Sequence, residues 1–409
     1  MKHIDTVIIG GGQAGLAMSR CLTEYHIDHV ILERGRVGER WRSERWDSLR
    51  LLTPNWQSRL PHFHYDGKHP DDFMTMPEFT RHLEGYAESF EAPIQTGTTV
   101  QIVERLNDRR FRIATDNGDW LANNVVVATG FCDTPRVPAF SAAIPTDIVQ
   151  VVPSDYRNPS QLPQGGVLVV GASATGLQIA DELAQTDRKV TLAVGTHVRV
   201  PRRYRGKDIL YWMDAMGAFN APADPGEERK TPPPQLVGTP ENRNIDLGEL
   251  QKNGVRLAGR AISAHGDRVH FADDLDAKIE AADSQMMQLL AKIDGFIASS
   301  SALAPAADLD SITAVKVRTA PTVIDLRTEN IRTVVWATGY ERLYPWLKIP
   351  VLDDRGEIPH AGGVTPEPGL YVLGMRFQRS KGSNLIDGVG RDAEVLSDLL
   401  AERFRNKAA

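Results

Sequence analysis

Short runs of apolar residues recur along the chain and predict strands that are buried on both faces. They occupy residues 6–9, 29–32, 125–130, 167–170, 189–193, 334–339 and 370–374. Stretches expected to form helices follow several of these runs, at about 14–25, 177–185 and 391–404. Apolar strands that alternate with helices in this way are typical of a parallel sheet covered by helices. The pattern therefore predicts an α/β protein.

A glycine-rich turn follows the first apolar run. Three glycines in it have the G-x-G-x-x-G spacing: Gly10, Gly12 and Gly15. They allow a tight turn, close approach of the backbone to a pyrophosphate, and close packing of helix on strand. The helix that follows, beginning near Gln13 and Ala14, points its N–H groups and its positive dipole end at the phosphates.

Glu33 ends the next strand, 23 positions after Gly10. A carboxylate at this place accepts hydrogen bonds from ribose hydroxyls and repels a 2′-phosphate. Strand, loop, helix, strand and acid together predict a first dinucleotide site, and a second such loop later in the chain suggests that the two sites hold a flavin and a nicotinamide dinucleotide. A glycine-rich turn without a ligand is the alternative interpretation.

A second loop repeats the spacing after the run at 167–170. Its expected cofactor-binding residues are Gly171, Ser173, Ala174 and Gly176. Ala193 stands where Glu33 stood in the first unit, so no carboxylate excludes a 2′-phosphate. Three arginines follow within ten residues: Arg199, Arg202 and Arg203. Guanidinium groups bind phosphate bidentately, which favours NADPH over NADH. One or more of the three could instead be an ordinary surface charge.

The apolar strands at 125–130 and 334–339 both end in Ala-Thr-Gly, once after each glycine loop. Small residues let the backbone pass close to a cofactor. The residues expected to do so are Ala128, Thr129, Gly130, Thr338 and Gly339. The repetition predicts the closing strands of two nested Rossmann-like domains.

Further contacts with the flavin cofactor are expected from the first domain. The residues are Arg34, Trp41, Arg42, Val100 and Asp387. Trp41 could equally be a core anchor and Arg42 a solvated charge. The last helix is expected to point its N-terminus at the flavin pyrimidine, where its dipole would stabilise the charge of the reduced ring. Asp387 would then hold a ribityl hydroxyl, or only cap that helix.

Composition narrows the possible functions. The chain has 409 residues, of which 41% are hydrophobic and 24% charged, as in a globular protein. Its net charge of −6 gives no basic surface for nucleic acid and no reason to expect a membrane surface as partner. No stretch approaches the roughly 18 apolar residues that span a bilayer. The apolar run after Lys2 is broken by glycines, which favours a strand over a signal peptide. Cys21 and Cys132 form no CxxC pair. We expect a cytoplasmic protein, and no metal.

The chain resembles the flavin-containing monooxygenases, class B flavoproteins related to Baeyer–Villiger monooxygenases and to the plant auxin-forming enzymes. The resemblance rests on both glycine loops, both Ala-Thr-Gly strands and the segment 49–55. It implies FAD and NADPH as cofactors and O2 and a small organic molecule as substrates. It also implies that NADPH reduces FAD, that O2 adds at flavin C4a, and that retained NADP⁺ shields the resulting C4a-(hydro)peroxyflavin from water. By similarity, Asn55 would hydrogen-bond near this oxygen.

The family's linker signature is only partly present. Tyr156 matches it, but Val152 stands where a histidine is expected, and Ser141 and Ala142 replace its glycine region. An NADPH–flavin oxidoreductase or an uncoupled NADPH oxidase is therefore the alternative to a monooxygenase, and a nucleotide sensor is a non-enzymatic alternative. The missing CxxC argues against a disulfide reductase.

The expected domains are nested. Residues 1–160 and 325–409 would form the FAD-binding domain, residues 161–213 and 241–272 the NADPH-binding domain, and residues 214–330 an insertion. The insertion opens with a proline-rich stretch, 221–240, read as an extended surface loop. A heptad-like seam follows, with apolar residues at Leu275, Ile279, Ala282, Met286, Leu289, Ile293 and Phe296. It could be a helix packed on its own domain, a lid over the substrate, or a contact in a homodimer.

Overall fold

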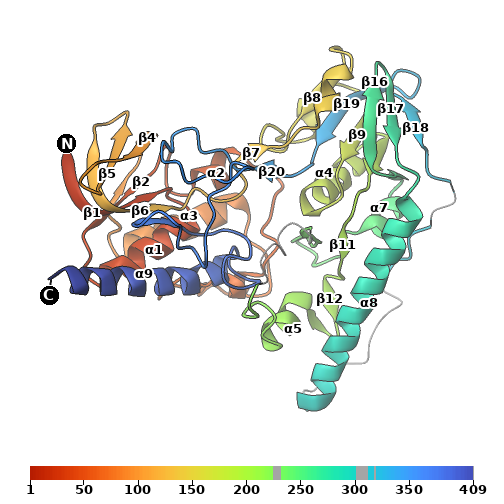
Figure 1. The fold of residues 1–409 in the computed structure, drawn as a ribbon. Coiled ribbons are helices and arrows are strands. Elements are labelled where there is room, and N and C mark those ends of the chain that lie inside the picture. The colour runs from red at the N-terminus through yellow and green to blue at the C-terminus, as the bar shows by residue number, and fades with distance from the viewer. Residues whose placement is uncertain (224–231, 301–311, 317–318, 409) are drawn as a thin grey trace.

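Two lobes, each built around its own sheet, make up the protein in this computed structural model (Figure 1). The structure describes residues 1–223, 232–300, 312–316 and 319–408. The N-terminal strand and the C-terminal helix both belong to the first lobe, so the chain leaves this lobe, builds the second and returns. In the proline-rich stretch, residues 224–231 lie outside the described residues. Residues 235–239 are buried, which corrects the expectation of a surface loop there.

The first lobe holds a seven-stranded sheet. Its strands are β1 (Lys2–Ile9), β2 (His29–Leu32), β3 (Ile94–Gln95), β4 (Val100–Arg105), β5 (Phe111–Thr115), β6 (Trp120–Val127) and β21 (Leu370–Val372). The order β3-β2-β1-β6 is parallel, β21 joins β6 in parallel, and β5 and β4 extend the sheet antiparallel. The helices of this lobe are α1 (Gln13–Glu24), α2 (Glu39–Ser43), α3 (Met76–Ser89) and α9 (Ile386–Ala408), with a 3₁₀ turn η1 (Asn55–Gln57). Helix α1 packs on α9 beneath the sheet (Figure 1).

The second lobe has a five-stranded, wholly parallel sheet of order β15-β10-β9-β19-β8. These strands are β8 (Val149–Val151), β9 (Gly166–Val170), β10 (Val190–Ala193), β15 (Arg256–Ala258) and β19 (Ile331–Trp336). Helices α4 (Ala174–Ala184) and α7 (Leu247–Lys252) pack beside it, and a smaller antiparallel sheet holds β16 (Ala261–His265), β17 (Arg268–Phe271) and β18 (Val323–Asp325). The predicted α/β class with two Rossmann-like sheets is confirmed.

The remaining elements of the described residues are short, except for the long helix α8 (Leu275–Ser300). The short ones are β7 (Thr134–Pro135), β11 (Val198–Arg199), β12 (Arg203–Tyr204), β13 (Lys207–Asp208), β14 (Pro234–Gln235), β20 (Tyr340–Glu341), α5 (Ile209–Ala215) and the 3₁₀ turns η2 (Ala139–Ala143) and η3 (Pro159–Gln161). Strand β7 pairs antiparallel with β20 where the chain crosses between the lobes (Figure 1). Strand β20 directly follows the second Ala-Thr-Gly, and β7 begins four residues after the first.

The sheet order differs from the expected domain boundaries. Strand β8 falls within the expected FAD-binding segment 1–160, and β19 within its second segment 325–409, yet both strands pair in the second sheet. The reason is that β19 is apolar throughout its C-terminal half and is buried between β9 and β8. The second Ala-Thr-Gly therefore closes the second sheet, and the chain returns to the first lobe only after it.

Helix α8 forms at the predicted heptad seam. Its buried residues are Leu275, Ile279, Ala282, Met286, Leu290 and Ile293. Leu290 takes the place expected for Leu289, because a straight helix of 3.6 residues per turn drifts away from a strict seven-residue repeat. The buried face packs on β11 and on a cluster that includes α5, as expected for a helix laid on its own domain. No residue of α8 is among the described residues that line the cavity discussed below, so the structure does not support a lid.

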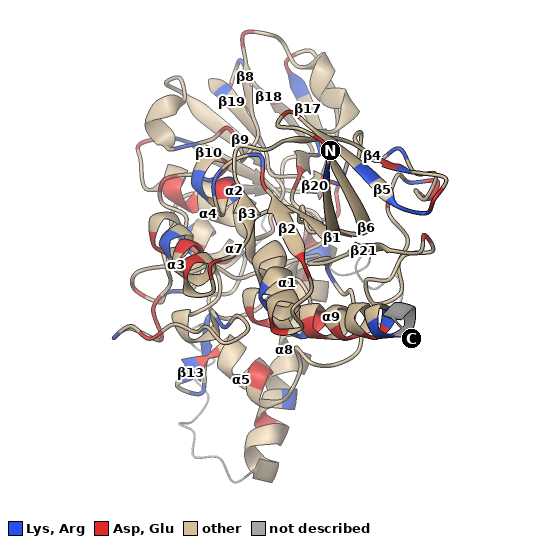
Figure 2. Ribbon diagram, turned by 90° about the vertical axis from the view of Figure 1, so that its left-hand side faces the viewer, with Lys and Arg blue, Asp and Glu red and all other residues tan. Residues whose placement is uncertain are grey.

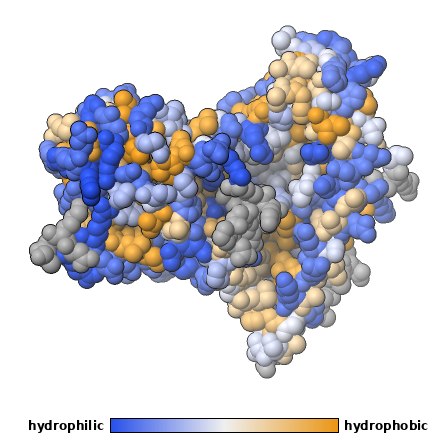
Figure 3. Space-filling view, viewed as in Figure 1, coloured by the Kyte–Doolittle hydropathy of each residue, from blue (hydrophilic) through white to orange (hydrophobic). Residues whose placement is uncertain are grey.

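The surface is mixed in character. Figure 2 shows Lys and Arg interspersed with Asp and Glu, and Figure 3 shows hydrophilic side chains over most of one face with apolar side chains in small groups on both lobes. None of the helices in the described ranges is long and apolar enough to cross a membrane.

Candidate functional site

Each glycine loop lies against the Ala-Thr-Gly end of a strand in its own sheet. Gly10 has φ +112°, and a Cβ placed on it would lie 2.6 Å from the carbonyl oxygen of Ala128. Gly171 has φ +108°, and a Cβ there would collide with the carbonyl oxygen of Ala337. A side chain at either position is excluded both by backbone conformation and by space. The structure thus pairs the four motifs as two equivalent units.

The helices that follow the loops begin without side-chain caps. Helix α1 starts after Gly12 and α4 after Ser173, neither first turn contains an acid, and neither of these two N-cap residues makes a side-chain capping hydrogen bond. A Cβ added to Gly12 would meet no atom within 4 Å, so space is open beside the start of α1. Uncapped N–H groups, a positive dipole end and open space fit a pyrophosphate at each helix. The residues present therefore fit two dinucleotides.

Glu33 braces the first loop. Its carboxylate accepts hydrogen bonds from the backbone N–H groups of Gly11 (2.6 Å) and Gly35 (2.8 Å). This position at the end of β2 is the one that the sequence predicts, and its contact with a ribose stays a prediction. Arg34 points to the surface and pairs with Glu44 (3.1 Å). Val100, half-buried, begins β4.

The short helix α2 carries one expected residue toward the first loop and one away from it. Trp41 donates from Nε1 to the side chain of Gln13 (3.2 Å), beside the start of α1. Arg42 instead pairs with Glu84 on α3 (2.6 Å), so the structure does not support its expected contact with the cofactor. The two side chains diverge because neighbours one position apart lie on different faces of a helix.

Arg40 lies where the sequence pointed to Arg42. Its guanidinium donates to the carbonyl oxygens of Thr129 (3.2 Å) and Cys132 (2.8 Å) and pairs with Asp133 (2.6 Å). It thus fixes the chain just after the first Ala-Thr-Gly. No spacing rule separates Arg40 from Arg42 in the sequence.

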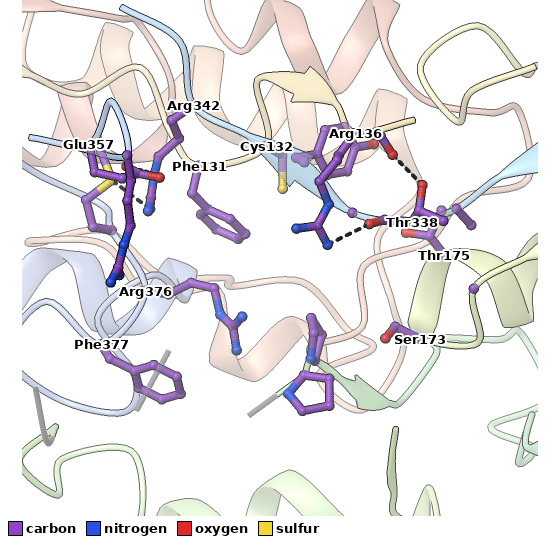
Figure 4. Close-up of a pocket in the computed structure, with 18 of the residues that line it drawn as sticks. Phe131, Cys132, Arg136, Ser173, Thr175, Thr338, Arg342, Glu357, Arg376 and Phe377 are labelled. Carbon is purple, nitrogen blue, oxygen red and sulfur yellow. Dashed lines mark hydrogen bonds and ion pairs between the residues drawn. The ribbon is translucent and has the colours of Figure 1, made fainter. Parts of the chain in front are cut away.

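A cavity of about 1600 Å³ lies between the two sheets. From the second lobe it is lined by the glycine loop and the second Ala-Thr-Gly, including Gly171, Ser173, Ala174, Thr338 and Gly339. From the first lobe it is lined by Phe131 and Cys132, just after the first Ala-Thr-Gly, and by residues 375–378 after β21 (Figure 4). It therefore opens at the carboxyl ends of strands of both sheets, where open α/β sheets bind their ligands. The glycines of the first loop are not among its described lining residues.

The cavity wall is rich in arginine. Its described lining residues include Arg136, Arg260, Arg342, Arg355 and Arg376, against the acids Asp353 and Glu357. Arg342 pairs with Glu357 (2.6 Å), and Arg136 donates to the carbonyl oxygen of Thr338 (3.2 Å, Figure 4). Five guanidinium groups and two carboxylates give the wall a positive balance that suits anionic ligands.

The arginines expected at the 2′-phosphate occupy other places. The side chain of Arg199 is 2% exposed and pairs with Asp246 (2.6 Å) and Asp283 (2.7 Å). Neither it nor Arg202 lines the cavity. A buried guanidinium that is already paired with a carboxylate cannot turn to a phosphate without leaving that carboxylate uncompensated. The structure therefore corrects the assignment of Arg199.

Arg202 is corrected for the same reason, and Arg203, although exposed, does not line the cavity. Arg202 is equally buried, pairs with Asp208 (2.5 Å) and lies 4.8 Å from the ring centroid of Phe73. Arg203 donates to the carbonyl oxygen of Gly206 within the hairpin β12–β13 (2.7 Å). All three arginines thus stabilise the connection after β10.

Arg260 lies near the place that the sequence assigned to these arginines. It lines the cavity together with Gly195 and Thr196, which follow β10, and a Cβ on Gly195 would come within 4.0 Å of its side chain. Lys278 at the start of α8 donates to the hydroxyl of Thr196 (3.1 Å). Strand β15 pairs with β10 and ends two residues before Arg260, so only the sheet order brings this residue to the end of β10.

Asn55 lies outside the described lining of the cavity. It is 4% exposed and donates from its side-chain nitrogen to the carbonyl oxygen of His69 (2.9 Å). Its backbone N–H binds the carbonyl oxygen of Asp72. These contacts hold the loop after η1, so the structure does not support a role for Asn55 beside the reacting oxygen.

Asp387 is bound by an arginine that the sequence did not single out. Arg59 donates to both of its carboxylate oxygens (2.8 Å each) and also to Asp214 of α5 (3.1 Å). With both oxygens engaged and the side chain 8% exposed, neither the ribityl contact nor the helix cap expected for Asp387 is supported. Arg59 instead ties the start of α9 to α5.

The linker between the lobes makes one polar contact with α4. Tyr156 donates its hydroxyl to Glu182 (2.6 Å), and burial raises the pKa of both side chains. Val152, in the place of the family's histidine, packs half-buried in the core of the second lobe. The linker is also held to the first lobe, because Arg157 donates to the carbonyl oxygen of Arg45 (3.3 Å) and its own carbonyl oxygen accepts from the N–H of Asp47 (2.9 Å).

Comparison with known proteins agrees with this geometry. Residues 7–215 match the pyridine nucleotide-disulphide oxidoreductase family. An uncharacterised CzcO-like oxidoreductase of Geobacillus kaustophilus is 35% identical over 98% of this chain and 99% of its own length. The probable indole-3-pyruvate monooxygenase YUCCA1 of Arabidopsis thaliana is 31% identical over 49% of each chain.

Among solved structures, the flavin-containing monooxygenase of Stenotrophomonas maltophilia has a similar fold. Its TM-score is 0.69 at 18% identity, over 98% of this chain and 99% of that one. The resemblance to flavin-containing monooxygenases is confirmed, and the family implies FAD and NADH or NADPH as cofactors. The chain belongs to the pyridine nucleotide-disulphide oxidoreductase family, with the two-dinucleotide fold that flavin monooxygenases share.

Proposed function

We propose that the protein is an FAD- and NADPH-dependent monooxygenase. In the balanced reaction, substrate, O2, NADPH and H⁺ give the oxygenated substrate, NADP⁺ and water. The observation that carries the proposal is the single cavity that joins the second glycine loop to the strand ends of the first sheet. A cavity placed there would bring a hydride donor, a flavin ring and a small substrate together.

When bound, FAD supplies the hydride acceptor and the activation of O2. The chain would hold it through the N–H groups at the start of α1, with the open side of Gly12 facing the pyrophosphate. Arg40 would keep the strand end at Thr129 in place, and Trp41 would pack beside the start of α1. The apolar side chains of Phe131 and Met375 in the cavity wall would limit the access of water to the reacting atoms.

The nicotinamide dinucleotide would lie along the second loop, its pyrophosphate at the start of α4. Arg260, Thr196 and Lys278 would surround the 2′-phosphate at the end of β10. Two cations and a hydroxyl, at a strand end where Ala193 replaces the acid of the first unit, favour NADPH over NADH.

The relatives and the cysteines support oxygenation over disulfide reduction. One sequence relative bears the name of a monooxygenase of indole-3-pyruvate. Cys21 lies on α1 and Cys132 in the cavity wall, and neither forms a disulfide. Burial raises the pKa of Cys21 to about 12 and also raises that of Cys132, which disfavours the reactive thiolate.

A second candidate is an NADPH oxidase that releases hydrogen peroxide. It is favoured by Val152, an apolar residue where the family signature has a histidine. One experiment separates the two. FAD-loaded protein is given NADPH, ¹⁸O2 and in turn small sulfides, amines, ketones and 2-oxo acids, and product mass, NADPH and peroxide are measured. We expect one ¹⁸O atom in the product per NADPH for at least one class. Complete conversion of O2 to peroxide with every class would support the oxidase.

A further inference from the structure

The turn after β21 is built to direct two side chains into the cavity. Arg376 and Phe377 are half-buried, both line the cavity, and Figure 4 shows both pointing into it. Phe377 has φ +53°, a left-handed conformation that bulky residues rarely adopt. Strain of this kind persists only where the surroundings enforce it, and it gathers at ligand sites.

Buried side chains hold this turn in place. The side-chain oxygen of Gln378 accepts from the backbone N–H of Met375 (3.3 Å). The hydroxyl of Ser383 accepts from the N–H groups of Arg379 (3.0 Å) and Ser380 (2.9 Å). Gln378 is 5% exposed and Ser383 is fully buried. Hydrogen bonds between these two buried side chains and the backbone therefore stabilise the strained conformation of the turn.

The charge and shape presented there suit a particular kind of ligand. The guanidinium of Arg376 lies 5.1 Å from the ring centroid of Phe377, so a cation and an aromatic face stand together. Phe131, from the strand end of β6, also points into the cavity (Figure 4). A guanidinium binds a carboxylate through paired hydrogen bonds, while aromatic rings pack on a flat apolar body.

Arg376 stands on the wall opposite the elements that are expected to bind the second dinucleotide. The expected phosphate contacts of the second dinucleotide come from α4 and from residues around Arg260, all in the second lobe. Arg376 follows β21 of the first sheet, on the side where a flavin ring and a substrate would meet. The position of Arg376 thus suits an anionic group of the substrate better than a phosphate of the nicotinamide dinucleotide.

We infer that the cavity takes a substrate with a carboxylate on a flat, apolar body. Arg376 binds the carboxylate, and Phe131 and Phe377 pack on the body. This assignment of substrate class rests on the proposed function, because it takes the cavity as the site of reaction. An arylalkanoic or aryl-2-oxo acid has the required chemistry.

The test compares an acid with its neutral amide on the FAD-loaded protein. Dissociation constants of phenylacetate and phenylacetamide are measured by isothermal titration calorimetry, with and without NADP⁺. We expect the acid to bind about 10- to 100-fold more tightly, as hydrogen bonds between charged groups allow. Equal affinities in the wild-type protein overturn the inference without recourse to any variant.

Variants then locate the contact. Arg376→Gln is expected to remove the preference for the acid and to change the dissociation constant of the amide less than about twofold. Arg376→Lys is expected to keep part of the preference for the acid, because a lysine retains the positive charge. Arg203→Gln, on the surface hairpin, is the matched control and should change neither constant. If Arg376→Gln weakens NADP⁺ and leaves the acid preference intact, Arg376 is a coenzyme contact and the inference is wrong.

Binding is measured without turnover, so the outcome is independent of oxygenation. A protein that prefers the acid but never forms an oxygenated product retains this inference and loses the proposed function. A protein that oxygenates neutral compounds and shows no preference for the acid retains the proposed function and loses the inference.

Discussion

Replacement of Arg260 by alanine is expected to weaken NADPH selectively. Arg260 lies beside Gly195 and Thr196 at the end of β10, where the 2′ position of the second dinucleotide is expected. The change removes one guanidinium from the phosphate and leaves the glycine loop and α4 untouched. NADH has a neutral hydroxyl at this position and should lose little.

The magnitude follows from the exposure of the side chain. A hydrogen bond to a charged group contributes about 1.5–3 kcal/mol, and Arg260 is exposed, so solvent screening favours the lower end. Since about 1.4 kcal/mol corresponds to a factor of ten, the KM for NADPH should rise about tenfold. The KM for NADH should change less than about threefold.

Steady-state oxidation of both coenzymes measures the effect, with Arg203→Ala as the matched control. Arg203 lies in the same lobe, but its guanidinium is bonded within its own hairpin, so its removal should leave both constants unchanged. Equal effects of Arg260→Ala on NADPH and NADH, or a selective effect of Arg203→Ala, would refute the reassignment of the phosphate site.

Three further predictions concern buried groups and the first loop. Burial raises the pKa of Asp392 from 3.8 to about 6, so the folded protein binds this proton more tightly and loses about 3 kcal/mol of stability as pH rises through that interval. At pH 7.5 the Asp392→Asn variant should therefore unfold at a higher urea concentration than the wild-type protein. Near pH 3.5 the two proteins should unfold at the same urea concentration. The control variant Glu402→Gln, at an exposed position, should show no such dependence on pH. Arg199→Ala should lower the free energy of unfolding by about 3–5 kcal/mol, because it leaves a buried carboxylate unpaired, and should leave the ratio of the KM values for NADPH and NADH unchanged. Gly12→Ala should fold normally but purify without the yellow colour of bound FAD, because the added Cβ meets no protein atom but enters the space of the pyrophosphate. Gly10→Ala should instead be unstable, because its Cβ would collide with the carbonyl oxygen of Ala128. A yellow Gly12→Ala protein would count against the first dinucleotide site.

The glycine loops could be predicted because their constraints are local. The turn at Gly10 and the strand end at Ala128 each carry a short motif, and the fold brings the two into contact. The same holds for α8, where apolar spacing predicted the helix and most of its buried face. An element can be predicted well from the sequence when its apolar periodicity and the residues that start and end it all lie within one segment.

The charged residues could not be assigned in this way. Arg199 follows β10 closely enough to suggest a phosphate contact, but its carboxylate partners, Asp246 and Asp283, come from distant parts of the chain. Arg260 reaches the end of β10 only because β15 lies beside that strand in the sheet. Whether an arginine is exposed to solvent, paired with a carboxylate or bound to a ligand depends on which elements pack together in the fold. Closeness in the sequence does not predict this.

The proposed function requires that the cavity bring two dinucleotides together so that hydride passes from nicotinamide to flavin. Anaerobic stopped-flow mixing of the FAD-loaded protein with NADPH tests it most directly, by following the visible absorption of oxidised flavin. We expect rapid, saturable bleaching with NADPH, and a slower reaction or a higher half-saturating concentration with NADH. A protein that binds no FAD, or whose flavin stays oxidised in excess NADPH, would contradict it.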